Sequence, residues 1–294
     1  MRSSMIGLVG LTLVACGGAT AGSAPPQPAA RAAASVSAKA SALPAPVAAG
    51  LRELPELAQA FAAERVTGTI ALFDSQEGVL TCSDLKRCQT RVTPASTFKI
   101  PHSLVALETG LVDGPDSVLP WDKQTYSNDN WNQDLSFRDA FRFSCVPCYQ
   151  AFARKLGDRL EQEWLNKLGY GNRSIAGGTD KFWLEGGLAI SPLEQIDFLR
   201  RFDGDQLPIS QQNALIVRDI MTLDVTESYV LRGKTGSTGT PEDAHMLAWL
   251  VGWVEQGERR VFFATLLDGH APGVDPTQLR RPLTERILRS KGWL

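Results

Sequence analysis

Hydrophobic positions along the chain fall into two spacings, which predict strands near both ends and helices between them. Apolar residues recur at helical spacing in residues 51–64, so we expect the first helix there. Residues 67–75 have the β-branched and aromatic content of a strand. Near the other end, residues 246–255 and 260–267 are apolar segments separated by Gln256-Gly257-Glu258, and this pattern predicts a β-hairpin.

The middle of the chain is predicted to be mainly helical. One helix begins near Ser96 and ends at Gly110, because glycine commonly terminates helices. Further helices are predicted at residues 139–143, 149–169, 192–202, 211–221 and 276–290, and a short strand at residues 229–234. The expected fold class is therefore α/β (α+β), with an antiparallel sheet packed against helices and a helical subdomain.

The first 15 residues are typical of an export signal. Arg2 provides a positive start, and the apolar run of residues 5–15 is too short to span a bilayer. Leu13-Val14-Ala15-Cys16 resembles the lipobox of bacterial lipoproteins, which implies cleavage before Cys16 and a lipid on that cysteine. An ordinary secretory signal followed by a chance cysteine is the alternative. We expect an exported, periplasm-facing protein that is anchored to a bacterial membrane through Cys16.

Residues 16–50 are predicted to form a flexible tether. They are rich in Ala, Pro, Ser and Gly, and Arg31 and Lys39 are their only charged residues. Such a segment buries too little apolar surface to offset its ordering entropy. The folded, catalytic domain is therefore expected to cover residues 51–294, and the 43% hydrophobic content of the chain suffices for one large domain.

Charge and cysteine content exclude some classes of function. The net charge of −2, with no basic run, argues against a nucleic-acid partner. With three histidines in 294 residues, we expect no histidine-rich metal site. Export permits disulfides, and the short polar loop between Cys82 and Cys88 favours that bridge over one between Cys145 and Cys148.

Ser96-Thr97-Phe98-Lys99, directly after Pro94-Ala95, is the first candidate for catalytic chemistry. Residues three apart on a helix lie on one face, so the Lys99 amine is expected to lie near the Ser96 hydroxyl. A serine hydroxyl becomes a good nucleophile when a base removes its proton, and burial keeps a lysine amine neutral. The motif alone is common by chance, and a solvated helix face is its alternative interpretation.

Two downstream motifs make the pattern specific. Ser144-Cys145-Val146 and Lys234-Thr235-Gly236 follow in the order known for class A β-lactamases and penicillin-binding proteins, which carry Ser-x-x-Lys, Ser-Asp-Asn and Lys-Thr-Gly. With Val146 in the middle motif, the sequence resembles class D (OXA-type) serine β-lactamases over residues 67–290. The resemblance also includes Leu107-Glu108-Thr109-Gly110, Phe182-Trp183-Leu184-Glu185-Gly186 and Gly252-Trp253-Val254.

The resemblance implies hydrolysis of the β-lactam ring of antibiotics through an acyl-enzyme on Ser96. It implies that Lys99, carbamylated by CO2, is the general base, and that no cofactor or metal is needed. Val146 then lines an apolar pocket, and the indole N–H of Trp183 holds the carbamate, since an indole only donates.

The resemblance also implies how a β-lactam is bound. Backbone N–H groups of Ser96 and Ser237 form the oxyanion hole, and Ser144 relays a proton to the leaving nitrogen. Lys234, Thr235 and Gly236 lie on the strand beside the substrate, and Arg280 binds its carboxylate, with Arg281 as a competitor. The ligands implied are penicillins, cephalosporins or carbapenems, and the preference among them is left open.

The sequence also allows alternative assignments of the base and of the function. A class A base would be a glutamate at position 162, but Gln162 stands there, and we interpret Glu161 and Glu163 as exposed carboxylates of an amphipathic helix. Tyr170-Gly171-Asn172 is interpreted as a structural turn. A β-lactam sensor that stays acylated, or a penicillin-binding protein acting on peptidoglycan, is the alternative function. A Ser-His-Asp hydrolase is disfavoured, because no Gly-x-Ser-x-Gly occurs and His102 is six residues from Ser96.

Overall fold

A computed structural model describes residues 50–294. The predicted signal (1–15), the lipobox with Cys16 and the predicted tether up to residue 49 lie outside the described residues. Within residues 50–294, the structure contains no helix that is long and apolar enough to cross a membrane.

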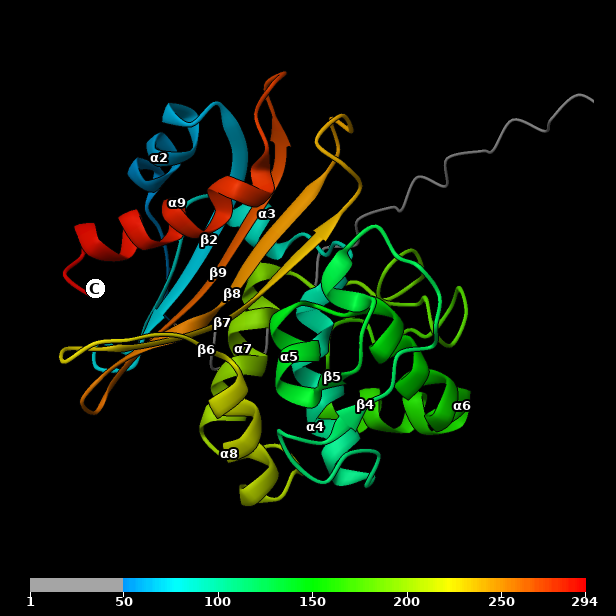
Figure 1. Ribbon diagram of the computed structural model, residues 1–294. Helices are drawn as coiled ribbons and strands as arrows, with labels where there is room; N and C mark the ends of the chain where they lie inside the picture. The colour runs from blue at the N-terminus through cyan, green and yellow to red at the C-terminus, as the bar shows by residue number, and fades with distance from the viewer. Residues whose placement is uncertain (1–49) are drawn as a thin grey trace, which may run out of the picture. The chain divides into compact units, whose positions relative to one another are not determined.

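A seven-stranded sheet forms the centre of the domain, in the order β1-β3-β2-β9-β8-β7-β6 (Figure 1). All neighbours are antiparallel except β1 and β3, which pair in parallel. The predicted hairpin is the pair β8 and β9. The strands are β1 (Leu51–Glu53), β2 (Val66–Asp74), β3 (Val79–Cys82), β6 (Thr222–Val225), β7 (Val230–Thr238), β8 (Leu247–Gln256) and β9 (Arg259–His270).

Helices cover both faces of this sheet. In Figure 1, α2 and α9 lie on one side of the strands, and α4, α5, α6, α7 and α8 form a subdomain on the other side. The helices are α2 (Ala58–Ala63), α3 (Leu85–Gln89), α4 (Lys99–Glu108), α5 (Phe137–Arg142), α6 (Val146–Leu168), α7 (Pro192–Asp203), α8 (Gln211–Ile220) and α9 (Pro276–Ser290), with a small sheet of β4 (Val118–Leu119) and β5 (Leu135–Ser136). The predicted α+β fold class is confirmed.

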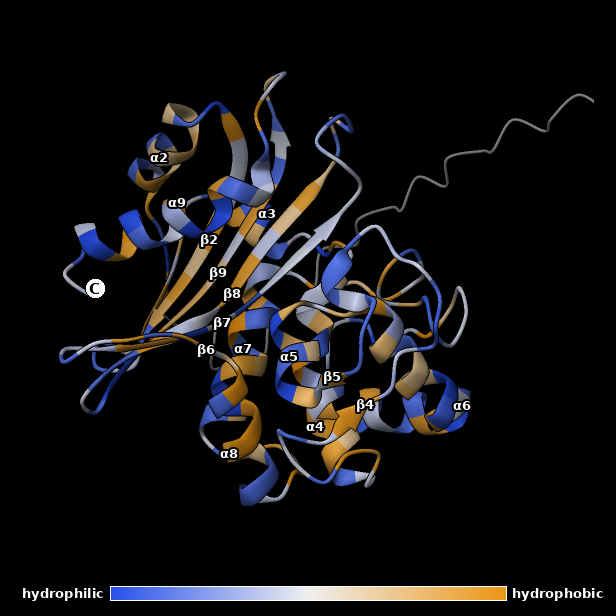
Figure 2. Ribbon diagram, in the orientation of Figure 1, coloured by the Kyte–Doolittle hydropathy of each residue, from blue (hydrophilic) through white to orange (hydrophobic). Residues whose placement is uncertain are grey.

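Two hydrophobic cores lie on opposite faces of the sheet. Along β8, Trp249 and Trp253 face the core shared with the helical subdomain, whereas Leu250 and Val254 face the core under α2 and α9. Since both faces are covered, the central strands are apolar almost without alternation, as Figure 2 shows for β8 and β9. This sandwiching fixes the position of β7, which carries the Lys-Thr-Gly motif.

The predicted helix at residues 51–64 is wrong in its first half. Leu51–Glu53 is strand β1, and the helical part consists of a 3₁₀ turn, η1 (Pro55–Leu57), followed by α2. Pro55 disfavours helical geometry at Leu54, whose φ and ψ are −124° and 81°. The Leu54 N–H donates instead to the Cys82 carbonyl at 2.7 Å.

Helix α6 differs from its prediction in one respect that matters for the site. It begins at Val146, three residues earlier than predicted, and it is kinked at Gly157, whose φ is +71°. Glu161 is buried rather than exposed, because its carboxylate turns inward to His102. Glu163 stays on the outer face, where it pairs with Arg159.

The preferred disulfide is also wrong. Cys145 and Cys148 form a disulfide, whereas Cys82 and Cys88 are free and buried. The predicted loop between Cys82 and Cys88 is largely helix α3, and the Cys88 thiol lies 3.2 Å from the Thr69 hydroxyl. Burial raises the pKa of the Cys82 thiol, which keeps this sulfur in its unreactive, protonated form.

Strands β7 and β8 pack so closely at Gly252 that a side chain there should destabilise the fold. A Cβ at this position would lie 1.9 Å from the carbonyl oxygen of Arg232, a backbone atom that cannot rotate away. We expect Gly252→Ala to lower the free energy of unfolding by about 3 kcal/mol, measured by urea denaturation.

Gly114→Ala is the matched control, since no atom lies within 4 Å of its added Cβ and its φ is not left-handed. Its unfolding free energy should change by less than about 1 kcal/mol. Equal stability of Gly252→Ala and the wild type would contradict the close approach of β7 and β8.

Candidate active site

Ser96 and Lys99 lie together where a 3₁₀ turn joins α4. Ser96 is in the turn η2 (Ala95–Phe98), and Lys99 is the first residue of α4. The Lys99 Nζ donates to the Ser96 Oγ at 3.0 Å. Ser96 is half-buried, so a ligand can reach it, whereas Lys99 is completely buried. The spacing of the motif therefore produces the predicted contact.

Burial controls the charge of Lys99. It lowers the pKa of the amine from 10.5 to about 7, because the low-dielectric surroundings disfavour the ammonium form. The amine lies 5.0 Å from the centroid of the Tyr149 ring. Near neutral pH, a large fraction of Lys99 is therefore a free amine, able to accept a proton from Ser96 or to react with an electrophile.

Trp183 contributes a buried donor with no acceptor. Its side chain is fully buried, it stacks on Phe98 with ring centroids 5.5 Å apart, and its Nε1 has no hydrogen-bond partner within residues 50–294. Buried polar atoms are normally paired, so an unpaired indole N–H points to an acceptor that binds there.

Ser144 and Lys234 form a second contact. The Lys234 Nζ donates to the Ser144 Oγ at 3.1 Å and to the Thr235 carbonyl at 3.0 Å. Ser144 has a φ of +56°, and Val146, half-buried, starts α6 two residues later. Burial lowers the pKa of the Lys234 amine, and repulsion from the positive charges of Lys99 and Arg280 lowers it further. Motifs 90 residues apart are thus brought together.

Strand β7 passes directly beside the Ser96 turn. A Cβ on Gly236 would lie 2.9 Å from the Pro94 carbonyl oxygen and 3.1 Å from the Thr97 nitrogen, so only glycine permits this approach. Ser237 is exposed next to it and is paired with Ala248 of β8. The site therefore has the Ser96 hydroxyl on one wall and β7 on the other.

The structure distinguishes between the two arginines of α9. Arg280 is half-buried and donates to the Gly236 carbonyl at 3.1 Å, which places its guanidinium at β7. Burial lowers the pKa of Arg280 to about 10. Arg281 is exposed and pairs with Glu285 one turn further along α9. Arg280 is therefore the arginine that touches the Lys-Thr-Gly strand.

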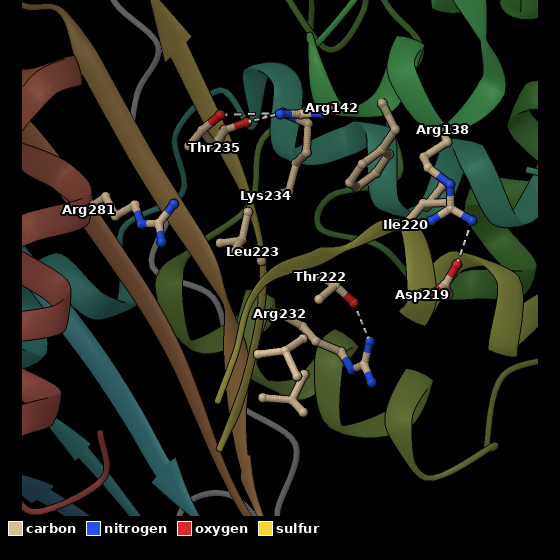
Figure 3. A pocket seen from close by; sticks show the side chains of 14 residues that line it. Arg138, Arg142, Asp219, Ile220, Thr222, Leu223, Arg232, Lys234, Thr235 and Arg281 are labelled. Atoms are coloured by element: carbon tan, nitrogen blue, oxygen red, sulfur yellow. Dashed lines mark hydrogen bonds and ion pairs between the residues drawn. The ribbon is translucent and has the colours of Figure 1, made fainter. Parts of the chain in front are cut away.

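A large open cleft of about 750 Å³ begins at Lys234 and Thr235 and extends toward the edge strand β6 (Figure 3). Ser96 does not line it. In Figure 3, the guanidinium of Arg138 turns toward Asp219, and that of Arg232 toward Thr222, at 2.7 Å each. Within residues 50–294, no group of three or more His, Cys, Asp or Glu side chains is arranged to hold a metal ion.

Two supporting residues were missed by the sequence analysis. Tyr149 borders Lys99, and its hydroxyl bonds Ser103 at 2.7 Å. Gln195 donates to the Thr97 Oγ1 at 2.9 Å, and Thr97 in turn donates to the Pro94 carbonyl at 2.7 Å, which braces the Ser96 turn. Their apolar or helical surroundings give no local motif, so only the tertiary structure reveals them.

Gly236→Ala tests the close approach of β7 to the Ser96 turn. The new methyl group has to push β7 outward by a few tenths of an ångström, which misplaces the substrate relative to Ser96. We expect the second-order rate of Ser96 acylation to fall roughly tenfold, measured by labelling with a fluorescent penicillin.

Two further variants serve as controls for the labelling of Gly236→Ala. Ser96→Ala should abolish labelling, and Gly114→Ala, remote from crowding, should label like the wild type. An unchanged rate for Gly236→Ala would mean that the distance between β7 and Ser96 does not limit acylation.

Comparisons with known proteins agree with this geometry. The family model for the penicillin-binding protein transpeptidase domain matches residues 63–289. The β-lactamase OXA-5 of Pseudomonas aeruginosa is 39% identical over 233 residues, which cover 79% of this chain and 86% of that protein. OXA-48 of Klebsiella pneumoniae is 37% identical over 231 residues, with 79% and 86% coverage.

Solved structures give the same result. A class D β-lactamase from Nostoc, YbXI, superposes with a TM-score of 0.77 and 39% identity, covering 81% of this chain and 99% of its own. A class D β-lactamase from Sebaldella termitidis gives a TM-score of 0.79 and 32% identity, with 83% and 99% coverage. The resemblance inferred from the motifs is confirmed, and the chain belongs to the class D serine β-lactamases.

Proposed function

We propose that this protein hydrolyses β-lactam antibiotics through an acyl-enzyme on Ser96, with Lys99 carbamylated by CO2 as the general base, and thereby confers resistance. The observation that carries the proposal is the 3.0 Å contact between Ser96 Oγ and a completely buried Lys99 amine. Membership of the class D family supports the reaction, and the unpaired Trp183 donor supports the modified lysine.

Acylation begins with loss of the Ser96 proton to the base at Lys99. The Oγ forms a bond to the lactam carbonyl carbon, and the backbone N–H groups of Ser96 and Ser237 stabilise the oxyanion. The carbon–nitrogen bond of the ring then breaks, and the leaving nitrogen takes a proton from Ser144. The Lys234 Nζ, 3.1 Å from the Ser144 Oγ, then returns a proton to Ser144, and the lowered pKa of Lys234 favours that release.

Hydrolysis of the acyl-enzyme needs a base that remains after acylation. A carbamate on Lys99 supplies an anionic oxygen for this purpose, held by the Trp183 indole N–H. The buried surroundings of Lys99, which include the Tyr149 ring, keep the amine neutral enough to take up CO2. Water activated there attacks the acyl carbon and releases Ser96.

Substrate binding depends on hydrogen-bond donors on β7 and on the neighbouring helix α9. Lys234, Thr235 and Arg280 are the groups proposed to bind the β-lactam carboxylate, and Gly236 allows β7 to lie close to the Ser96 turn. Arg280 donates to the Gly236 carbonyl, so its guanidinium is already oriented by the strand.

Sustained turnover that depends on CO2 tests this proposal. The purified protein is given a chromogenic β-lactam, once with bicarbonate and once after removal of CO2. We expect continuous hydrolysis with bicarbonate and a roughly tenfold lower rate without it, because an unmodified lysine is a poorer base for deacylation. A burst of one equivalent followed by no turnover in both conditions would instead support a β-lactam sensor or penicillin-binding protein.

Trp183→Phe is the matched variant for the same assay. It keeps an aromatic ring on Phe98 but removes the indole donor. Its turnover should require more bicarbonate than the wild type. If Trp183→Phe and the wild type had the same turnover at low CO2, Trp183 would contribute packing alone.

We further propose that the protein is exported and held at a bacterial membrane by a lipid on Cys16. The Leu13-Val14-Ala15-Cys16 pattern at the end of an apolar run supports this assignment. Cys16→Ala should move the protein from the membrane to the soluble fraction after cell fractionation, while its β-lactamase activity persists. Continued membrane association of this variant would contradict the lipid anchor.

A further inference from the structure

Ser144, the proposed proton donor to the leaving nitrogen, occupies a backbone position where glycine is usual. It follows the end of α5 with a φ of +56°, in the left-handed region. Its N–H donates to the Phe141 carbonyl at 3.1 Å. The next N–H, that of Cys145, donates to the Ala140 carbonyl at 2.8 Å. These are the two hydrogen bonds of a Schellman motif, in which glycine is common because a Cβ is disfavoured at this φ. Ser144 is therefore strained, and its neighbours have to hold it in this conformation.

A disulfide fixes the chain directly after Ser144. Cys145 is the N-cap of α6 and is bonded to Cys148 in the first turn of that helix. Cys145 is completely buried, and its Sγ accepts a hydrogen bond from the Cys148 N–H at 3.3 Å. The bridge ties the residue after Ser144 covalently to α6, while the Schellman hydrogen bonds tie it to α5. Ser144 thus connects two helices from a backbone that is held on both sides.

The conformation of Ser144 decides where its hydroxyl lies. The Ser144 Oγ accepts a hydrogen bond from the Lys234 Nζ at 3.1 Å, and Lys234 belongs to β7, whose position the sheet fixes. If the Ser144 backbone relaxed toward a negative φ, the hydroxyl would move away from this amine. A displacement of about 1 Å in a reacting group can cost a large factor in rate.

We propose that Cys145 and Cys148, joined by their disulfide, are positioning residues that hold the Ser144 hydroxyl against Lys234 for proton transfer during acylation. This inference rests on the role of Ser144 in the proposed function. Opening the bridge slows formation of the acyl-enzyme and leaves its hydrolysis unchanged, because the base proposed for hydrolysis is on Lys99. Disulfides persist in oxidising compartments, so the proposed export keeps the bridge closed.

Cys148 gives a reductant access to the bridge. It is half-buried and lines, with Trp121 and Trp131, a pocket of about 190 Å³. A thiolate of dithiothreitol bonds to the Cys148 Sγ, and the electron pair of the broken S–S bond goes to the Cys145 Sγ, which takes up a proton. The second thiol of dithiothreitol then closes a cyclic disulfide and releases Cys148 as a thiol. Two electrons pass from the dithiol to the protein.

The test compares the rate of Ser96 labelling by a fluorescent penicillin before and after reduction, at a temperature at which both forms stay folded. We expect the second-order rate of acylation to fall roughly fivefold, and the rate at which the label is released to stay within about twofold. Reoxidation should restore the original rate of acylation.

Cys148→Ser is the matched control for the reductant, because it opens the bridge and leaves Cys145 in place. It should be acylated at the rate of the reduced wild type and should not respond to dithiothreitol. A response would mean that the reductant acts elsewhere, for example on the thiols of Cys82 and Cys88.

Ser144→Ala separates positioning of the hydroxyl from a general effect on packing. Without the hydroxyl the bridge has no proton donor to position, so reduction should not slow acylation of this variant further. The inference is overturned if the reduced wild type is acylated as fast as the oxidised protein. It is also overturned if reduction slows release of the label as much as its attachment, or slows Ser144→Ala by the same factor as the wild type.

The oxidised proteins distinguish failure of this inference from failure of the proposed function. If penicillin does not label Ser96 of the wild type, or if Ser144→Ala is labelled at the wild-type rate, the proposed mechanism is wrong and the role of the disulfide falls with it. If Ser144→Ala is labelled slowly and the reduced wild type is not, only the role of the disulfide is wrong.

Discussion

Removal of the Lys99 amine from water is the constraint on which the site depends. An ammonium in contact with solvent would neither take a proton from Ser96 nor react with CO2. Because Lys99 is completely buried, its pKa falls to about 7, and the neutral amine becomes accessible at physiological pH. The serine three residues earlier remains half-buried, so a ligand can reach its hydroxyl while the Lys99 amine stays out of water.

The fold serves this separation by enclosing α4 on several sides. Helix α6 contributes Tyr149, the loop before α7 contributes Trp183, and β7 approaches the Ser96 turn so closely that position 236 must be glycine. The sheet is covered on both faces, which fixes β7 relative to α4. Three short motifs that are distant in the sequence thus form two lysine–serine pairs. Lys99 contacts Ser96 within the first motif, and Lys234 of the third motif contacts Ser144 of the second.

Sequence reasoning succeeded where the information is local. The spacing of Ser96 and Lys99 on a turn of helix, the β8–β9 hairpin and the extent of α9 all follow from short-range patterns, and the structure confirms them. The order of the motifs identified the family. The catalytic and binding roles assigned to the site residues, and the carbamate on Lys99, stay predictions.

Errors arose where tertiary contacts override local patterns. The segment before Pro55 is an edge strand because β3 offers it a partner, and the pattern within residues 51–64 does not record that partner. Glu161 looks like a solvated helix residue until His102 of α4 is placed opposite it. Likewise, the bridge between Cys145 and Cys148 depends on the turn between Ser144 and α6, which the C-x-x-C spacing alone does not define.

The central claim is that the buried amine of Lys99 takes up CO2, and ¹³C NMR of the substrate-free protein in ¹³C-bicarbonate tests it most directly. The account predicts a carbamate carbon signal that disappears in Lys99→Ala and weakens as the pH falls below about 7, where the amine becomes protonated. A wild-type spectrum without this signal at saturating bicarbonate would contradict the account.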